Sequence, residues 1–179
     1  MYVSEAVKSR FSCRAFTEKS VSKELIKEIL DVAKQAPSGG NLQPWHIHAI
    51  TGTKLDQIVS DIESKITDMP MGEKTEYDVY PPNLWEPYRS RRFKCGEDLY
   101  KSINIPREDK GARLKQLAKN LRFFGAPVGL FVYIDRKMGP PQWSDVGMFL
   151  QTVMLIAREK GLHSCAQEAW AMWHSTVKQ

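Results

Sequence analysis

The stretch Pro37-Ser-Gly-Gly-Asn-Leu-Gln-Pro-Trp45 decides how the chain is expected to fold. It is rich in Pro, Gly, Ser and Asn, a composition typical of a loop. Residues 22–36 before it carry apolar side chains at the three- and four-residue spacing of an amphipathic helix, with Ser22 as the expected N-cap. His46 to Thr51 after it is expected to be a strand. The stretch is therefore predicted to be a helix-to-strand loop.

The small residues of this loop suggest that it binds a ligand. Glycines allow a backbone to approach a ligand closely, because they lack a Cβ atom. A second interpretation is a plain turn that leads a core tryptophan, Trp45, into the interior. The residues of the loop are compatible with both interpretations.

The remaining chain predicts an α+β fold in which helices pack on a small sheet. Residues 139–141 are expected to form a turn, and residues 69–88, rich in Pro, Gly and aromatic side chains, an ordered excursion or lid. Further elements are expected as helices over 2–10, 53–66, 108–124, 144–160 and 168–177, and as strands over 128–134 and 163–167.

The expected helix 144–160 is apolar nearly all round. Such a helix must be covered on every side, which one small domain rarely achieves alone. The pattern therefore predicts that this helix lies at an interface between two subunits.

Length and composition favour one domain over residues 1–179, with 42% hydrophobic and 26% charged residues. The chain has no stretch long enough to span a membrane and no secretion signal, so a cytoplasmic location is expected. Cys13, Cys95 and Cys165 are widely spaced and form no CxxC motif. A disulfide framework is therefore not expected, in keeping with a reducing compartment.

The net charge of +5 raises the question of nucleic-acid binding. Outside a basic run over residues 89–94, lysines and arginines alternate with acids, which is typical of a solvated face. A basic protein also attracts anionic cofactors and substrates. The sequence has neither the GxGxxG nor the GxxxxGK[ST] motif. His46 and His48 share one face of a strand, but no cluster of further ligands supports a metal site, and none is expected.

Three segments taken together resemble the nitroreductase family: Arg10-Phe-Ser-Cys-Arg14, the loop over residues 37–45, and Gly161-Leu-His-Ser-Cys-Ala-Gln-Glu-Ala169. Their order and spacing match the family along the whole chain, and the middle of the chain is similar to the branch that includes nitrobenzoate reductases. The resemblance implies a nitroreductase-like α+β fold with a small, mainly antiparallel sheet, an intertwined homodimer, FMN as cofactor and NAD(P)H as co-substrate. It also implies a tail of a few tens of residues beyond position 179, so the domain is expected to be incomplete at its C-terminus.

Each segment has an implied role at the flavin. Arg10 suits the FMN phosphate, because a guanidinium makes paired hydrogen bonds, and Ser12 adds a hydroxyl. Arg14 resembles the basic residue near the flavin N1/O2 edge, where a fixed cation favours the reduced state. The alternative for this segment is a solvated loop.

The loop of one subunit is implied to close over the flavin of the other. The backbone amides of Glu168 and Ala169 match those that face flavin N5 and O4, although many relatives have Gly at the second position. The expected cofactor-binding residues are Arg10, Phe11, Ser12, Arg14, Pro37, Ser38, Gly39, Asn41, Gln43, Glu168 and Ala169.

A substrate pocket is expected from aromatic rings that stack on a planar compound and arginines that pair with its carboxylate or nitro group. The alternative is that these are surface arginines and core aromatics. No side chain is an evident general acid or base, so no catalytic residue is assigned. The expected substrate-binding residues are Arg89, Arg92, Phe123, Phe124 and Trp143, with Arg91 as a further candidate.

The resemblance implies a ping-pong reaction in which NAD(P)H gives a hydride to flavin N5 and a nitroaromatic or similar electron-poor substrate is then reduced. Alternatives are a member of the family that acts on quinones or enones, and a non-catalytic or degenerate FMN-binding dimer. A nucleic-acid-binding module is a third, less favoured hypothesis.

Overall fold

The computed structural model describes residues 1–179 and has an α+β architecture, as the sequence predicts. The chain divides into two compact units. The first contains Met1–Asp56 and Gly125–Ala166, and the second contains Gln57–Phe124 and Gln167–Gln179. No helix has the length and apolar character needed to cross a membrane.

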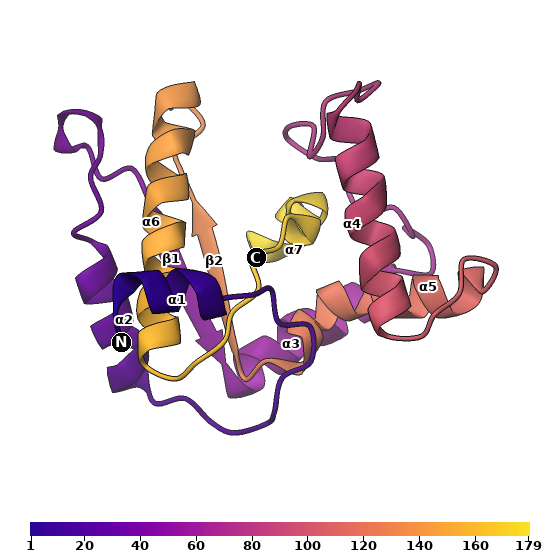
Figure 1. Cartoon of the computed structure of the whole chain (residues 1–179), viewed down its shortest axis with the longest axis horizontal. Helices are drawn as coiled ribbons and strands as arrows, with labels where there is room; N and C mark the ends of the chain where they lie inside the picture. The colour runs from indigo at the N-terminus through magenta and orange to yellow at the C-terminus, as the bar shows by residue number, and fades with distance from the viewer. The chain divides into compact units, whose positions relative to one another are not determined.

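The first unit is built from a two-stranded sheet and the helices that pack on it (Figure 1). The two strands are antiparallel, with His46 opposite Tyr133 and Thr51 opposite Val128. The predicted strands over 46–51 and 128–134 are thus confirmed, the second ending one residue early. The elements of this unit are α1 (Val3–Ser9), α2 (Lys23–Ala33), η1 (Gly39–Asn41), β1 (His46–Thr51), β2 (Val128–Tyr133) and α6 (Pro140–Glu159), and α3 (Gly52–Lys65) begins in it.

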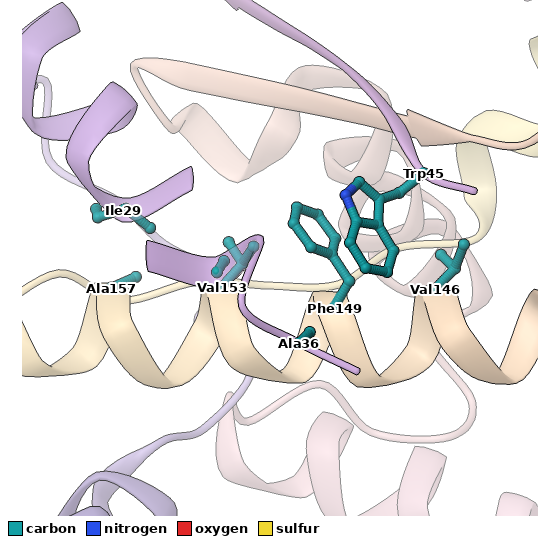
Figure 2. Packing of buried hydrophobic residues seen from close by; sticks show 8 residues of the cluster. Ile29, Ala36, Trp45, Val146, Phe149, Val153 and Ala157 are labelled. Atoms are coloured by element: carbon teal, nitrogen blue, oxygen red, sulfur yellow. The ribbon is translucent and has the colours of Figure 1, made fainter. Parts of the chain in front are cut away.

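The core of the first unit lies along one face of α6, where α2 and the sheet meet it. Figure 2 shows Phe149 of α6 against Trp45, and the two rings stack at 4.8 Å between centroids. Phe149 is fully buried and Trp45 nearly so. Trp45 is therefore a core residue, as one of the two interpretations of its loop proposed.

Two helix boundaries differ from the prediction. Helix α2 starts as expected, since Ser22 Oγ accepts the Leu25 N–H at 3.1 Å, but it ends at Ala33. Helix α6 begins at Pro140, so the expected turn over 139–141 is already its start. Prolines are well accommodated in a first helical turn, where the backbone N–H has no partner within the helix.

The second unit is mainly helical. The expected helix 108–124 ends at Ala118 and continues as a 3-10 segment, and the expected final helix 168–177 is a 3-10 segment followed by one short α-helical turn. A helix over residues 88–102 was not predicted. The elements are the end of α3, α4 (Tyr88–Ser102), α5 (Lys110–Ala118), η2 (Lys119–Gly125, which reaches into the first unit), η3 (Ala169–Trp173) and α7 (His174–Val177).

A carboxylate fixes the C-terminal segment of the second unit. Glu73 accepts the backbone N–H groups of Ser175 and Thr176 at 2.8 and 3.1 Å, and the Thr176 hydroxyl at 2.7 Å. The Glu73 N–H in turn donates to Met172 O at 2.7 Å. Gly72 has φ +79°, and a Cβ there would lie 2.7 Å from the same oxygen, so only glycine fits this approach.

Candidate functional site

The segment after α1 lies beside the segment after α6. Arg10 closes the last turn of α1 with its N–H, and the chain then becomes extended. Ser12 forms an isolated parallel bridge with Ser164, and the Cys13 N–H donates to Ser164 O at 3.0 Å. The expected strand over 163–167 is therefore a single bridge rather than a strand.

Two arginines of this segment carry positive charge that no carboxylate neutralises. Arg10 and Arg14 are both partly buried. The Arg14 guanidinium donates to Ser12 O at 3.2 Å, a contact that leaves its charge uncompensated. The Arg10 side chain makes no ion pair or hydrogen bond within the chain. The pair can therefore receive an anionic ligand without first breaking a salt bridge.

Phe11 lies between these groups and is exposed over 55% of its surface. Its ring contacts the His163 ring at 4.8 Å between centroids. The segment thus carries an aromatic ring, a hydroxyl and two cations within five residues.

The loop over residues 37–43 has an unusual backbone. Gly40, Asn41 and Gln43 all adopt left-handed conformations, with φ of 56°, 55° and 47°. The Gln43 N–H donates to Ser38 Oγ at 2.9 Å and closes the loop on itself. Left-handed non-glycine residues concentrate at functional sites, where the surrounding structure holds them in place. The side chains of Asn41 and Gln43 are exposed, as is Pro37.

A buried aspartate of α6 holds this loop. Asp145 is 5% exposed, and both of its carboxylate oxygens lie 3.3 Å from the Gly39 N, which donates to them. Sequence reasoning missed Asp145. The available signal was an acidic residue beside the apolar run of the helix, a residue type that is rarely buried unless it has a partner.

The loop and the Arg10–Arg14 segment attach to opposite ends of α6. The loop is held at Asp145, whereas α1 is held by Arg158, whose Nε donates to Ser9 Oγ at 3.0 Å. These two α6 residues are 13 positions apart, which is about 20 Å along a helix. Within one chain, the structure does not bring the two predicted parts of the cofactor site together.

The other two predicted cofactor residues belong to the second unit. Glu168 precedes η3, and Ala169 is its first residue. The Glu168 carboxylate accepts the Tyr77 hydroxyl at 3.1 Å. Burial, together with the negative charge of Glu168, raises the pKa of Tyr77 to about 12. Gln167 donates to the backbone and side-chain oxygens of Asn120 at 3.1 and 2.9 Å, which fixes the start of this segment.

The two predicted substrate arginines lie on α4 and are exposed. Arg89 Nε pairs with Glu86 at 2.8 Å. The Arg92 guanidinium lies over the Tyr80 ring, 3.9 Å from its centroid. One turn of helix separates the two arginines, so both can reach the same anionic group.

The predicted substrate aromatics are placed differently from one another. Phe123 and Phe124 are 7% and 6% exposed, and Phe123 stacks on Trp170 at 4.3 Å. In this conformation their rings are core residues and cannot stack on a substrate. Trp143, at the start of α6 in the first unit, is 48% exposed.

The histidines of β1 share one face of the strand, as the sequence predicts. Both His46 and His48 stack on Tyr133 of β2, with centroids 5.2 and 5.6 Å apart. His48 Nε2 and the Tyr133 hydroxyl are 3.0 Å apart and share a hydrogen bond. Their contacts are those of a cross-strand aromatic cluster.

Comparison with known proteins identifies relatives of this chain by sequence. The chain is 35% identical over 177 residues to the nitrobenzene nitroreductase of Ectopseudomonas oleovorans, covering 99% of this chain and 78% of the relative. It is 40% identical over 172 residues to a 4-nitrobenzoate reductase of Pseudomonas putida, covering 96% and 74%.

Solved structures of nitroreductases also match this chain. The crystal structure of the FMN and NADPH-dependent nitroreductase NfnB from Sphigopyxis sp. strain HMH matches with a TM-score of 0.96 and 48% identity, over 99% of this chain and 80% of that one. NfnB from Mycobacterium smegmatis in complex with NADPH matches with a TM-score of 0.91 and 25% identity, over 98% and 79%. The model of the nitroreductase family itself matches residues 7–179, and the chain therefore belongs to that family.

Proposed function

We propose that this protein is an FMN-dependent NAD(P)H oxidoreductase that reduces nitroaromatic or similar electron-poor compounds. The observation that carries the proposal is the match, at 48% identity and a TM-score of 0.96, to a nitroreductase that is FMN and NADPH-dependent. The relatives at 35% and 40% identity are named for nitrobenzene and 4-nitrobenzoate. Its three unpaired cysteines suit a reducing compartment such as the cytoplasm.

The residues after α1 fit an anionic flavin mononucleotide. We assign the phosphate to Arg10 and the Ser12 hydroxyl, because the Arg10 guanidinium has no other partner in the chain. Arg14 is held by Ser12 O and keeps a full positive charge, which favours a ligand that gains negative charge on reduction. FMN, when bound, supplies the capacity to accept and pass on a hydride. The protein orients it and sets the charge around it.

The site is proposed to form between two copies of the chain. The loop over 37–43 and the Arg10–Arg14 segment are about 20 Å apart along α6. In a twofold dimer with antiparallel α6 helices, the start of one α6 lies near the end of the other. The loop of each subunit then meets the arginines of its partner. Asn41 and Gln43 are exposed in the loop and available to hydrogen-bond a ligand.

In the second unit, Arg89 and Arg92 of α4 are proposed to offer two cations for a carboxylate or nitro group. In the first unit, exposed Trp143 of α6 is proposed to offer a planar surface for stacking. Glu168 and Ala169 are proposed to present backbone amides to the reactive edge of the flavin. Phe123 and Phe124 are left out of the pocket because they are buried.

The test is an anaerobic reduction in two steps. The purified protein, reconstituted with FMN, is mixed with NADPH or NADH, and the visible absorbance of the flavin is followed. We expect bleaching, followed by recovery of the colour when 4-nitrobenzoate is added. A protein that binds FMN but is not bleached by either nucleotide would be a non-catalytic flavin binder, and the proposed activity would be wrong.

A further inference from the structure

Two of the three cysteines lie on paired segments of the first unit. The Ser12–Ser164 bridge aligns the two segments in parallel, and the Cys13 N–H donates to Ser164 O at 3.0 Å. Cys13 and Cys165 are the next residues after the bridge, one on each segment. Although they are 152 positions apart in sequence, the register places them opposite one another.

The residues before the bridge show the same register independently. The rings of Phe11 and His163 are 4.8 Å apart between centroids. Alternate residues of an extended segment point to the same side, so Cys13 and Cys165 share the side of this ring pair. Neighbouring strands lie about 4.8 Å apart. That spacing falls within the Cα separation of about 4.4 to 6.8 Å that a disulfide requires.

The surroundings of the two thiols agree with this placement. Both side chains are partly buried, and the Cys13 thiol donates to Ala15 O at 3.1 Å. Burial raises the pKa of the Cys165 thiol; the positive charge of Arg14 opposes the rise, and Cys13 adds to it. The third cysteine, Cys95, is exposed on α4 in the second unit.

We propose that Cys13 and Cys165 form a redox-active dithiol that closes to an intramolecular disulfide when a hydroperoxide oxidises it. One thiolate attacks the peroxide, the O–O bond breaks, and an alcohol or water leaves, so that this sulfur becomes a sulfenic acid. The second sulfur attacks it, the S–O bond breaks, water leaves and the S–S bond forms. The two thiols lose two electrons in total, and the peroxide gains them.

The test maps the thiols after oxidation. The reduced chain is treated with a small excess of hydrogen peroxide, the remaining thiols are alkylated, and peptides are identified by mass spectrometry. We expect a Cys13–Cys165 cross-linked peptide, 2 Da lighter than the reduced pair, with Cys95 alkylated. Cys95→Ser should give the same cross-link. Cys13→Ser and Cys165→Ser should lose it, leaving a sulfenic acid that dimedone traps.

The proposal is overturned if Cys13 and Cys165 are each alkylated or over-oxidised without a cross-link, or if either pairs with Cys95. A second measurement needs no variant. Phenylarsine oxide bridges two thiols within reach of each other, so one equivalent should protect Cys13 and Cys165 together from alkylation in the unaltered protein. Protection of neither cysteine would contradict the juxtaposition itself. Neither measurement depends on the cofactor.

Discussion

Arg10 and Arg14 are partly buried arginines with which no carboxylate pairs. Arg89 and Arg113, by comparison, are paired with glutamates. A partly buried guanidinium without an acidic partner is available to an anion from solution. The chemistry of a phosphate fits this position better than that of a neutral ligand.

Replacing Arg10 by alanine is expected to weaken FMN binding by about 1.5–3 kcal/mol, roughly 10- to 150-fold, because a charge-assisted contact is lost. The measurement is a fluorescence titration of the apo-protein with FMN. Lys8→Ala removes the same unit charge from the exposed face of α1 and should change the affinity little. Equal losses in both variants would show that net charge, rather than a specific contact, governs binding.

Asp145 is a buried residue of α6 that holds the loop over residues 37–43. It does so by accepting the Gly39 N–H. Replacing it by alanine leaves the Gly39 N–H without its acceptor and is expected to lower the free energy of unfolding by about 1–3 kcal/mol. Asp145→Asn keeps one carbonyl oxygen and should recover most of the loss. The measurement is the urea denaturation midpoint of the unaltered protein, Asp145→Ala and Asp145→Asn. If all three have the same midpoint, the carboxylate does not hold the loop.

At the scale of elements, much of the first unit could be predicted. The two strands and α2 have simple signals, namely short apolar runs and an i, i+3, i+4 pattern with a serine cap, and the structure keeps these elements with small changes at their ends. In these elements the pattern of apolar residues and the local secondary-structure propensity favour the same structure. Secondary structure can be predicted from sequence when the two agree.

Other elements could not be predicted, because tertiary contacts decide them. Helix α4 has no buried residue and therefore no apolar stripe; local ion pairs such as Lys94–Asp98 and the Glu97–Arg113 pair with α5 support it instead. Phe123 and Phe124 adopt left-handed backbone, which bulky residues rarely do, and this conformation is incompatible with a regular helix that continues to residue 124. Stacking on Trp170, distant in sequence, accompanies that conformation.

The candidate site also has parts that the sequence predicts and parts that depend on tertiary contacts. The resemblance to a family predicts the arginine segment and the glycine loop as parts of the site, since their residue types recur in order. Asp145 could not be found that way, because its role exists only once α6 lies under the loop. Phe123 and Phe124 were assigned to a substrate pocket from their aromatic character alone, and the fold buries them.

Glu73 makes the α7 segment sensitive to acid. Burial would raise the pKa of this carboxyl, but hydrogen bonds from Thr176 and Ser175 and the charge of Lys65 outweigh it, so the pKa lies below its ordinary value of 4.5. The stabilisation is therefore fully present above pH 4.5 and is lost as the pH falls through the lowered pKa.

Glu73→Gln should accordingly lower the melting temperature at neutral pH, and its difference from the unaltered protein should shrink in acid. The measurement is the melting temperature of both proteins across a series of pH values from 7 downward. Glu18→Gln, a change at an exposed residue, serves as the control. A difference that stays constant with pH would mean that the charge of Glu73 contributes nothing.

For the whole molecule, we propose that two chains build each flavin site. The arginines lie near one end of α6 and the loop at the other, and we therefore propose that a single chain holds two half-sites rather than one site. A twofold pair of chains would then hold two complete sites. The proposed arrangement would also give the apolar α6 the subunit cover that its composition predicts.

Mixed dimers test this claim most directly. One chain carries Arg10→Ala and Arg14→Ala, the other carries Asn41→Ala and Gln43→Ala, and the two are co-expressed with different tags and purified through both. Each mixed dimer then has one undamaged site and one doubly damaged site. Each parent variant is expected to bind FMN weakly, and the mixed dimer is expected to bind one FMN with nearly the affinity of the unaltered protein. A mixed dimer that binds no better than its parents, or two tags that never co-purify, would contradict it.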